Sequence, residues 1–135
     1  MKNIDEIIGM LDSNNQKEVQ EEGIMIAMKV KTLKIFFFPS YPNNPPYYSC
    51  KCLWENSAKV IANKSDEELE PYLPDMFEWL VDVNWPGAWT IFERLKNYKR
   101  DSFNQVFNEY LKRSIAFNDE NLKSILIDLR TSREK

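Results

Sequence analysis

Acidic and tryptophan side chains gather in the middle of this 135-residue chain. Positions 66–82 hold seven carboxylates and no lysine or arginine. Glu78 and Asp82 stand four positions apart, the spacing at which side chains on a helix become neighbours. Such a pair could serve as general acid and base if a cleft shifted their pKa values apart. The chain has no histidine, so the commonest base, metal ligand and nucleophile activator is missing.

The sequence has no other feature typical of an enzyme. It contains neither a glycine-rich phosphate loop nor a Gly-x-Ser-x-Gly nucleophile motif. Without histidine, Cys50 and Cys52 cannot complete a zinc site, and a disulfide across two positions is geometrically poor. We therefore expect reduced thiols in a cytoplasmic protein that has no cofactor, no metal and no enzymatic activity.

The acidic segment 66–82 has two possible explanations. Carboxylates in a first helical turn face the positive end of the helix, which explains Asp66 to Glu68. It does not explain Glu78 and Asp82, which would repel each other on one helix face. The acids form either a solvated face or a surface that steers a basic protein partner. In the second case, reversing Glu78 and Asp82 to lysine would slow partner binding and leave stability nearly unchanged.

Three of the four tryptophans lie within eleven positions of one another, beside these acids. On a helix, Trp85 and Trp89 share a face that differs from the face of Ala88 and Ile91. An exposed tryptophan beside carboxylates would suit a protein-binding hot spot. The alternative is that the rings pack between adjacent helix layers. The first interpretation predicts a partner-binding surface made of Glu70, Asp75, Glu78, Trp79, Asp82, Trp85 and Trp89.

Composition and spacing predict one helical domain over residues 1–135. Only three glycines are available for turns, and apolar residues such as Ile4, Ile7, Ile8 and Leu11 recur at helical spacing. Ser65 and Glu68 have the spacing of a capping box. The first three predicted helices cover about 4–11, 17–31 and 49–63. The next runs from Pro71 or Pro74 to Asp82, and another from an Asn84 cap to Leu95. The last two run from Asp101 or Ser102 to Leu111 and from Asn118 to Leu129, and we expect a frayed end at 131–135.

Residues 31–48 interrupt this pattern. Four prolines between positions 39 and 46 forbid a continuous helix, so we expect one long irregular loop rich in proline and aromatic residues. The rings from Phe36 to Phe38 either form an exposed contact patch or fill the space of a missing helix.

Small residues recur with a period near 30. Ala27 and Ala58 are 31 positions apart, and Ala58 and Ala88 are 30 apart. Small side chains let helices approach closely, and this period in helix pairs is typical of an α-solenoid, with an irregular bundle as the alternative. The net charge of −3 disfavours a nucleic-acid binder, and no apolar run approaches the ~20 residues of a membrane span.

The stretches from Trp54 to Ala58 and from Ser65 to Ala88 resemble a bacterial family of unknown function that is itself similar to HEAT repeats. The resemblance rests on Trp-Glu-Asn at 54–56 and on Asn-Trp-Pro-Gly-Ala at 84–88. It implies an all-α, HEAT/armadillo-like right-handed α-α superhelix of three to four helix pairs, with no catalytic residues. Small helical proteins of this kind often act as immunity proteins beside toxin genes.

Taken together, the sequence predicts a non-enzymatic module that binds a basic protein, and an immunity or antitoxin-like role is the sharper hypothesis. Two alternatives stay open: a glycosylase-like enzyme acting on nucleic acid, which would need a positive groove, and a structural homodimer.

Overall fold

The computed structural model describes residues 2–40 and 51–134, and its regular elements are all helical over these residues. The prediction of an all-α fold is confirmed. The α-helices are α1 (Ile4–Met10), α2 (Lys17–Ala27), α3 (Trp54–Ala62), α4 (Asp66–Leu69), α5 (Leu73–Trp79), α6 (Ala88–Lys96), α7 (Ser102–Ala116) and α8 (Glu120–Arg133). The short 3-10 helices within the described residues are η1 (Lys34–Phe36), η3 (Lys51–Leu53) and η4 (Glu70–Tyr72).

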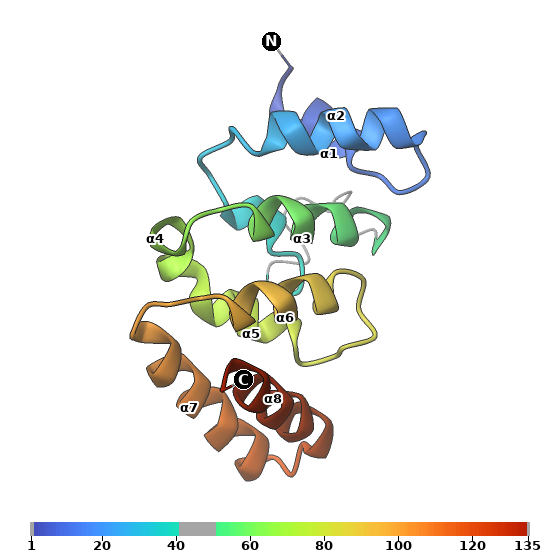
Figure 1. Cartoon of the computed structure of the whole chain (residues 1–135). Helices are drawn as coiled ribbons and strands as arrows, with labels where there is room; N and C mark the ends of the chain where they lie inside the picture. Colours follow the sequence, from blue (N-terminus) through green and yellow to red (C-terminus); the bar gives the residue numbers. More distant parts are fainter. Residues whose placement is uncertain (1, 41–50, 135) are drawn as a thin grey trace.

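The helices stack as successive pairs (Figure 1). One layer consists of α2, α3, α6 and α8, each in contact with the next. The second layer consists of the elements that precede them: α1 packs on α2, η1 on α3, α5 on α6 and α7 on α8. The first pair lies at one end of the stack and the α7–α8 pair at the other. None of the described helices is long and apolar enough to cross a membrane.

Polar side chains set several helix starts, as the sequence indicates. Ser65 and Glu68 form the predicted capping box, in which the hydroxyl accepts from one backbone N–H and the carboxylate from the other. Asn3 accepts from the backbone N–H of Glu6, and Asp119 accepts from that of Leu122. These caps satisfy N–H groups that have no partner inside the helix.

Four predicted helix ends are wrong. Helix α2 ends at Ala27 rather than at 31, and α5 ends at Trp79 rather than at Asp82. Gly87, not Asn84, precedes α6, because a left-handed turn at Gly87 redirects the chain there. Helix α8 runs to Arg133, so residues 131–133 are helical rather than frayed.

The three phenylalanines after α2 fill the interior. Phe36, Phe37 and Phe38 are buried, and the ring centroid of Phe37 lies 5.3 Å from that of Tyr72. Their burial contradicts the interpretation of an exposed contact patch and agrees with rings that fill interior space beside α3, on which η1 packs. Residues 41–50, the rest of the predicted loop, lie outside the described residues.

Cys52 departs from the sequence expectation. Its sulfur takes part in a disulfide, so the prediction of a reduced thiol is wrong for this residue. Cys50 lies outside the described residues. The argument for a cytoplasmic protein from reduced thiols therefore loses its basis.

Cationic side chains reach back to the ends of earlier helices. The Lys64 ammonium donates to the carbonyls of Met28 and Val30, just beyond α2. Arg133 of α8 donates to the carbonyls of Leu95 and Tyr98 at the end of α6, at 2.6 and 2.7 Å. Positive groups suit these positions because the last carbonyls of a helix lack partners inside it and carry partial negative charge.

Small residues let α6 approach α3, as their spacing predicts. Ala58 and Ala88 are buried, and a β-carbon added at Gly87 would lie 2.7 Å from Cβ of Ala58. It would also lie 3.1 Å from the carbonyl oxygen of Trp54. Gly87 has φ of 89°, a conformation that L side chains rarely adopt.

Replacing Gly87 with alanine should therefore lower the free energy of unfolding by at least about 1 kcal/mol, from the left-handed backbone alone. Gly9→Ala is the matched control. Gly9 lies within α1 with nothing near its missing β-carbon, so alanine there should raise stability by about 0.5–1 kcal/mol. Urea unfolding of the two variants measures both changes, and equal effects would contradict the close approach at Gly87.

Candidate functional site

Three of the seven acids of segment 66–82 pair with arginines that lie later in the chain. Asp66 pairs with Arg94 at 2.5 Å, and Glu70 pairs with Arg100 at 3.0 Å. Glu78 pairs with Arg113 at 2.8 Å. Each pair joins residues about thirty positions apart, so it links one helix pair to the next. The uneven charge distribution along the sequence is thus balanced by contacts within the fold.

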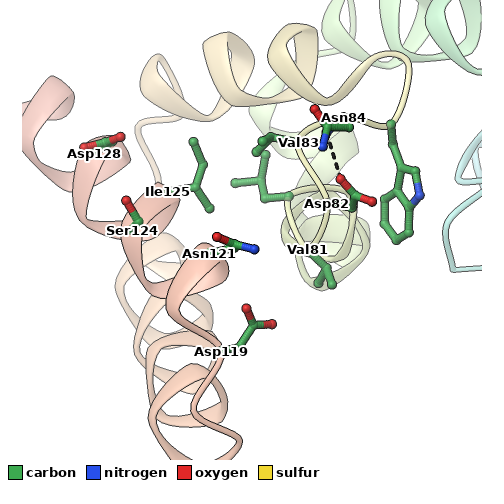
Figure 2. Close-up of a pocket in the computed structure, with 11 residues that line it drawn as sticks. Val81, Asp82, Val83, Asn84, Asp119, Asn121, Ser124, Ile125 and Asp128 are labelled. Atoms are coloured by element: carbon green, nitrogen blue, oxygen red, sulfur yellow. Dashed lines mark hydrogen bonds between the residues drawn. The ribbon is translucent and has the colours of Figure 1, made fainter.

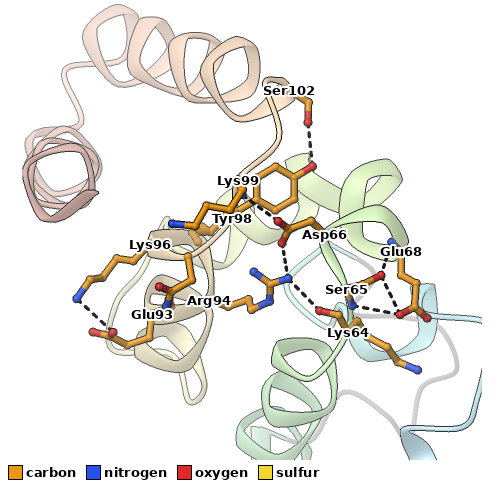
Figure 3. A network of polar contacts seen from close by, with 12 residues as sticks. Lys64, Ser65, Asp66, Glu68, Glu93, Arg94, Lys96, Tyr98, Lys99 and Ser102 are labelled. Carbon is orange, nitrogen blue, oxygen red and sulfur yellow. Dashed lines mark hydrogen bonds and ion pairs between the residues drawn. The ribbon is translucent and has the colours of Figure 1, made fainter. Parts of the chain in front are cut away.

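Asp66 is the centre of the most extensive of these networks (Figure 3). Its carboxylate accepts from the Arg94 guanidinium and from the backbone N–H of Lys99 at 2.9 Å. Arg94 also donates to the carbonyl of Lys64. Burial alone would raise the pKa of Asp66, but the hydrogen bonds from Arg94 and Lys99 outweigh it and lower the pKa below its ordinary value.

Glu78 holds a second network at the junction of α5 and α7. Its carboxylate accepts from the Tyr110 hydroxyl at 3.0 Å and from both terminal nitrogens of Arg113. Burial raises the pKa of Tyr110, and the charge of Glu78 raises it further. The hydrogen bond to Glu78 raises the pKa of Arg113. Glu78 and Asp82 do not share a helix face, because α5 ends before Asp82.

The predicted partner-binding acids therefore separate into two groups. Glu70 and Glu78 are engaged within the fold, and Asp75 is half-buried. Asp82 lies in the turn after α5, where its carboxylate accepts from the backbone N–H of Asn84 at 2.9 Å. The expectation that Glu78 can be reversed without loss of stability does not fit these contacts, because reversal would place a lysine ammonium against the Arg113 guanidinium.

The tryptophans also have different positions. Trp79 is 0% exposed and donates to the carbonyl of Pro86, so we assign it to the core rather than to a contact surface. Trp85 is half-buried, with its ring centroid 5.6 Å from that of Trp54. Trp89 is 54% exposed and borders a shallow groove of about 520 Å³ with Ala62 and Glu93.

A larger cleft, of about 710 Å³, separates the turn after α5 from α8 (Figure 2). Its charged lining residues are all carboxylates: Asp82, Asp119 and Asp128. Figure 2 shows Asp82 in the turn, and on the other side of the cleft Asp119 just before α8 and Asp128 within it. Asn84, Trp85, Asn121, Ser124 and the apolar residues Leu80, Val81, Val83 and Ile125 complete the lining.

The sequence identified only part of this cleft. Asp82 and Trp85 were predicted as binding residues, and the fold brings them to one cleft. Asp119 and Asp128 were missed, because they lie 37 and 46 positions after Asp82 and only the stacking of the last two pairs brings them near. The sequence offers a signal for Asp119, because the helix predicted to begin near Asn118 has this acid at its N-terminus.

The chemistry open to the cleft is electrostatic. Carboxylates, amides and a tryptophan edge can bind cationic and hydrogen-bond-donating groups, such as lysine and arginine side chains. Over residues 2–40 and 51–134, no group of three or more acidic or cysteine side chains is placed to hold a metal ion. Arg113 lies outside the cleft lining but interacts with Asp119, since the charge of Asp119 raises the pKa of the Arg113 guanidinium.

A family model described as a domain of unknown function, DUF5071, matches residues 54–133. The chain belongs to the DUF5071 family. The match begins at α3 and covers every residue of the acid-lined cleft. No curated protein and no solved structure matches this DUF5071 chain. The residues of the Trp-Glu-Asn stretch hold the fold together: Asn56, for example, donates to the carbonyl of Leu11 at 2.8 Å.

Acid should weaken the Asp66 network in a defined pH range. Because folding lowers the pKa of Asp66 below its ordinary value of 3.8, its ionised form stabilises the protein fully above 3.8. This stabilisation is lost as the pH falls below 3.8 through the lowered pKa. Asp66→Asn should therefore cost about 2 kcal/mol at neutral pH, the scale of hydrogen bonds to charged groups. The difference from wild type should shrink below pH 3.8.

Guanidinium unfolding at several pH values measures this change. Glu67→Gln is the matched control, since Glu67 is an exposed acid on the same short helix and should change stability little. A constant difference between wild type and Asp66→Asn across the pH range would show that the carboxylate charge does not stabilise the fold.

Proposed function

We propose that this DUF5071 protein is a non-enzymatic protein-binding module whose acid-lined cleft receives a basic segment of its partner. The observation that carries the proposal is the charge of the cleft. Arg100 and Arg113 balance Glu70 and Glu78, whereas no lysine or arginine is among the lining residues around Asp82, Asp119 and Asp128. An acidic concave surface attracts cationic partners and raises their association rate.

The arrangement of the helices supports a more specific fold assignment. Each helix of the α2–α3–α6–α8 layer contacts its neighbours along the stack, which is typical of α-solenoids such as HEAT and armadillo repeats. Proteins of this type bind partners along extended surfaces. A right-handed HEAT-like superhelix is therefore part of the proposal.

The partner that suits this surface best is a protein with a strongly basic face. An immunity or antitoxin-like protein that covers a cationic toxin domain in the cytoplasm of a bacterium would fit this description. A glycosylase-like enzyme fits less well, because the phosphate backbone of a nucleic acid would be repelled by the carboxylates of the cleft. Its groove would have to carry positive charge.

A structural homodimer is the second candidate function. Phe117 is 77% exposed at the end of α7, and Ile115 on the same helix is 58% exposed. Large apolar side chains in such positions often belong to contacts between chains. Analytical ultracentrifugation separates this candidate from the first, because a dimer through Phe117 would form without any partner and would dissociate in Phe117→Ser.

The binding proposal predicts that reversing Asp82 and Asp128 to lysine abolishes partner capture. Immobilised protein would be exposed to native cell extract at low and high salt, and the bound proteins would be identified by mass spectrometry. We expect wild type to hold a basic protein at low salt and release it at high salt. Against that purified partner, the double variant should associate at least about tenfold more slowly.

The matched control is Glu22→Lys with Glu67→Lys, which changes net charge equally at two exposed acids outside the cleft. This control should keep nearly the wild-type association rate. If the cleft variant captures the partner as wild type does, the cleft is not the binding site. If both variants lose it equally, overall charge rather than the cleft governs binding.

A further inference from the structure

A second cleft, of about 440 Å³, lies where the C-terminal ends of α6 and α8 meet. It is lined by Lys96, Asn97, Lys99, Ser132 and Arg133. All of its charged lining residues are cations, so its sign is opposite to that of the acid-lined cleft. The proposed binding of a basic partner does not use it.

Arg133 is held rigidly at this cleft. One terminal nitrogen donates to the carbonyls of Leu95 and Tyr98, and the guanidinium carbon lies 3.6 Å from the ring centroid of Phe103. Contact with the ring and carbonyls fixes the plane of the guanidinium before any ligand arrives. A group fixed in advance loses little conformational entropy on binding, which strengthens recognition.

The positive charge of the cleft is only partly balanced by the fold. Lys96 forms a surface pair with Glu93 at 3.3 Å, a contact that contributes little in water and is easily exchanged. Among the described residues, no ion pair joins Lys99 or Arg133 to a carboxylate. Asp66 acts on Arg133 through its charge, but Asp66 is already bound to Arg94.

Helix ends account for part of this arrangement. The last carbonyls of α6 and α8 carry partial negative charge, which favours cations nearby. Arg133 already donates hydrogen bonds to carbonyls at the end of α6 and so offsets their partial negative charge. Lys96 and Lys99 add two further cations at the same opening. The cleft therefore holds more positive charge than the end of α6 requires.

We propose that this basic cleft binds the phosphate group of a small ligand. Three cations and the Ser132 hydroxyl offer more donors than the two oxygens of a carboxylate can use, and the Asn97 amide keeps one N–H beside its bond to the carbonyl of Glu93. A phosphate monoester presents three terminal oxygens and close to two negative charges, which matches this set. Arginine binds such groups through two parallel N–H donors, and lysine adds point charge.

The test uses the full chain with inorganic phosphate and with phosphoserine as probes, and acetate at the same ionic strength for comparison. Heteronuclear NMR titration should show saturable shifts at Lys99 and Ser132 with both phosphate probes and much weaker ones with acetate. Phosphate should also raise the melting temperature, because a ligand that binds the folded state stabilises it. Tighter binding of phosphoserine would identify a phosphate ester as the ligand, and tighter binding of inorganic phosphate the free ion.

Lys96→Gln with Lys99→Gln removes two charges without touching Arg133, and it should weaken phosphate binding at least about tenfold. Lys59→Gln with Lys112→Gln is the matched control, since both lysines are exposed and lie outside the cleft lining. The proposal is overturned if phosphate and acetate bind equally, or if the two double variants bind phosphate alike.

Discussion

Cationic side chains that reach back onto earlier helices hold this stack of helix pairs in register. Lys64 joins the second pair to the end of α2, Arg94 joins the third to the loop after α3, and Arg133 joins the fourth to the end of α6. In each case the acceptor is a main-chain carbonyl near a helix C-terminus, where hydrogen-bond acceptors are left over. Apolar packing brings the helices together, and these bonds fix how far each pair can shift along the next.

Contacts between successive helix pairs also explain why the acidic stretch 66–82 is not simply an acidic surface. Asp66, Glu70 and Glu78 are spread over one helical segment, and their arginine partners lie in α6, in the segment after it and in α7. Charge that looks segregated along the chain is paired across the stack. Two clefts at the edges of the last two pairs differ in sign, because carboxylates line one and cations line the other. Both clefts border α8, the acidic one along its first two-thirds and the basic one at its C-terminal end.

Local patterns in the sequence predicted local structure well. The helical class, the capping box at Ser65 and the burial of Phe36 to Phe38 all follow from spacing and side-chain type. Helix ends were harder, because Gly87 sets the start of α6 through a close approach to Ala58 that has no local signature. Of the acid-lined cleft, only Asp82 and Trp85 were predicted. The position of Asp128 relative to Asp82 depends on how the last two helix pairs stack. Trp79 is 0% exposed because its ring packs against Phe37 and Trp54, which are distant in the sequence.

The bonds that join the first helix pair to the rest are directed mostly at its backbone. Asn56 donates to the carbonyl of Leu11, and Lys64 donates to those of Met28 and Val30. Every amino acid presents the same carbonyl, so these hydrogen bonds place few demands on side-chain identity, and the demands come instead from buried residues such as Leu11 and Ala27. The outward side chains of that pair are therefore free to diversify while its attachment is kept. The family match begins at Trp54, so the α1–α2 pair lies outside it.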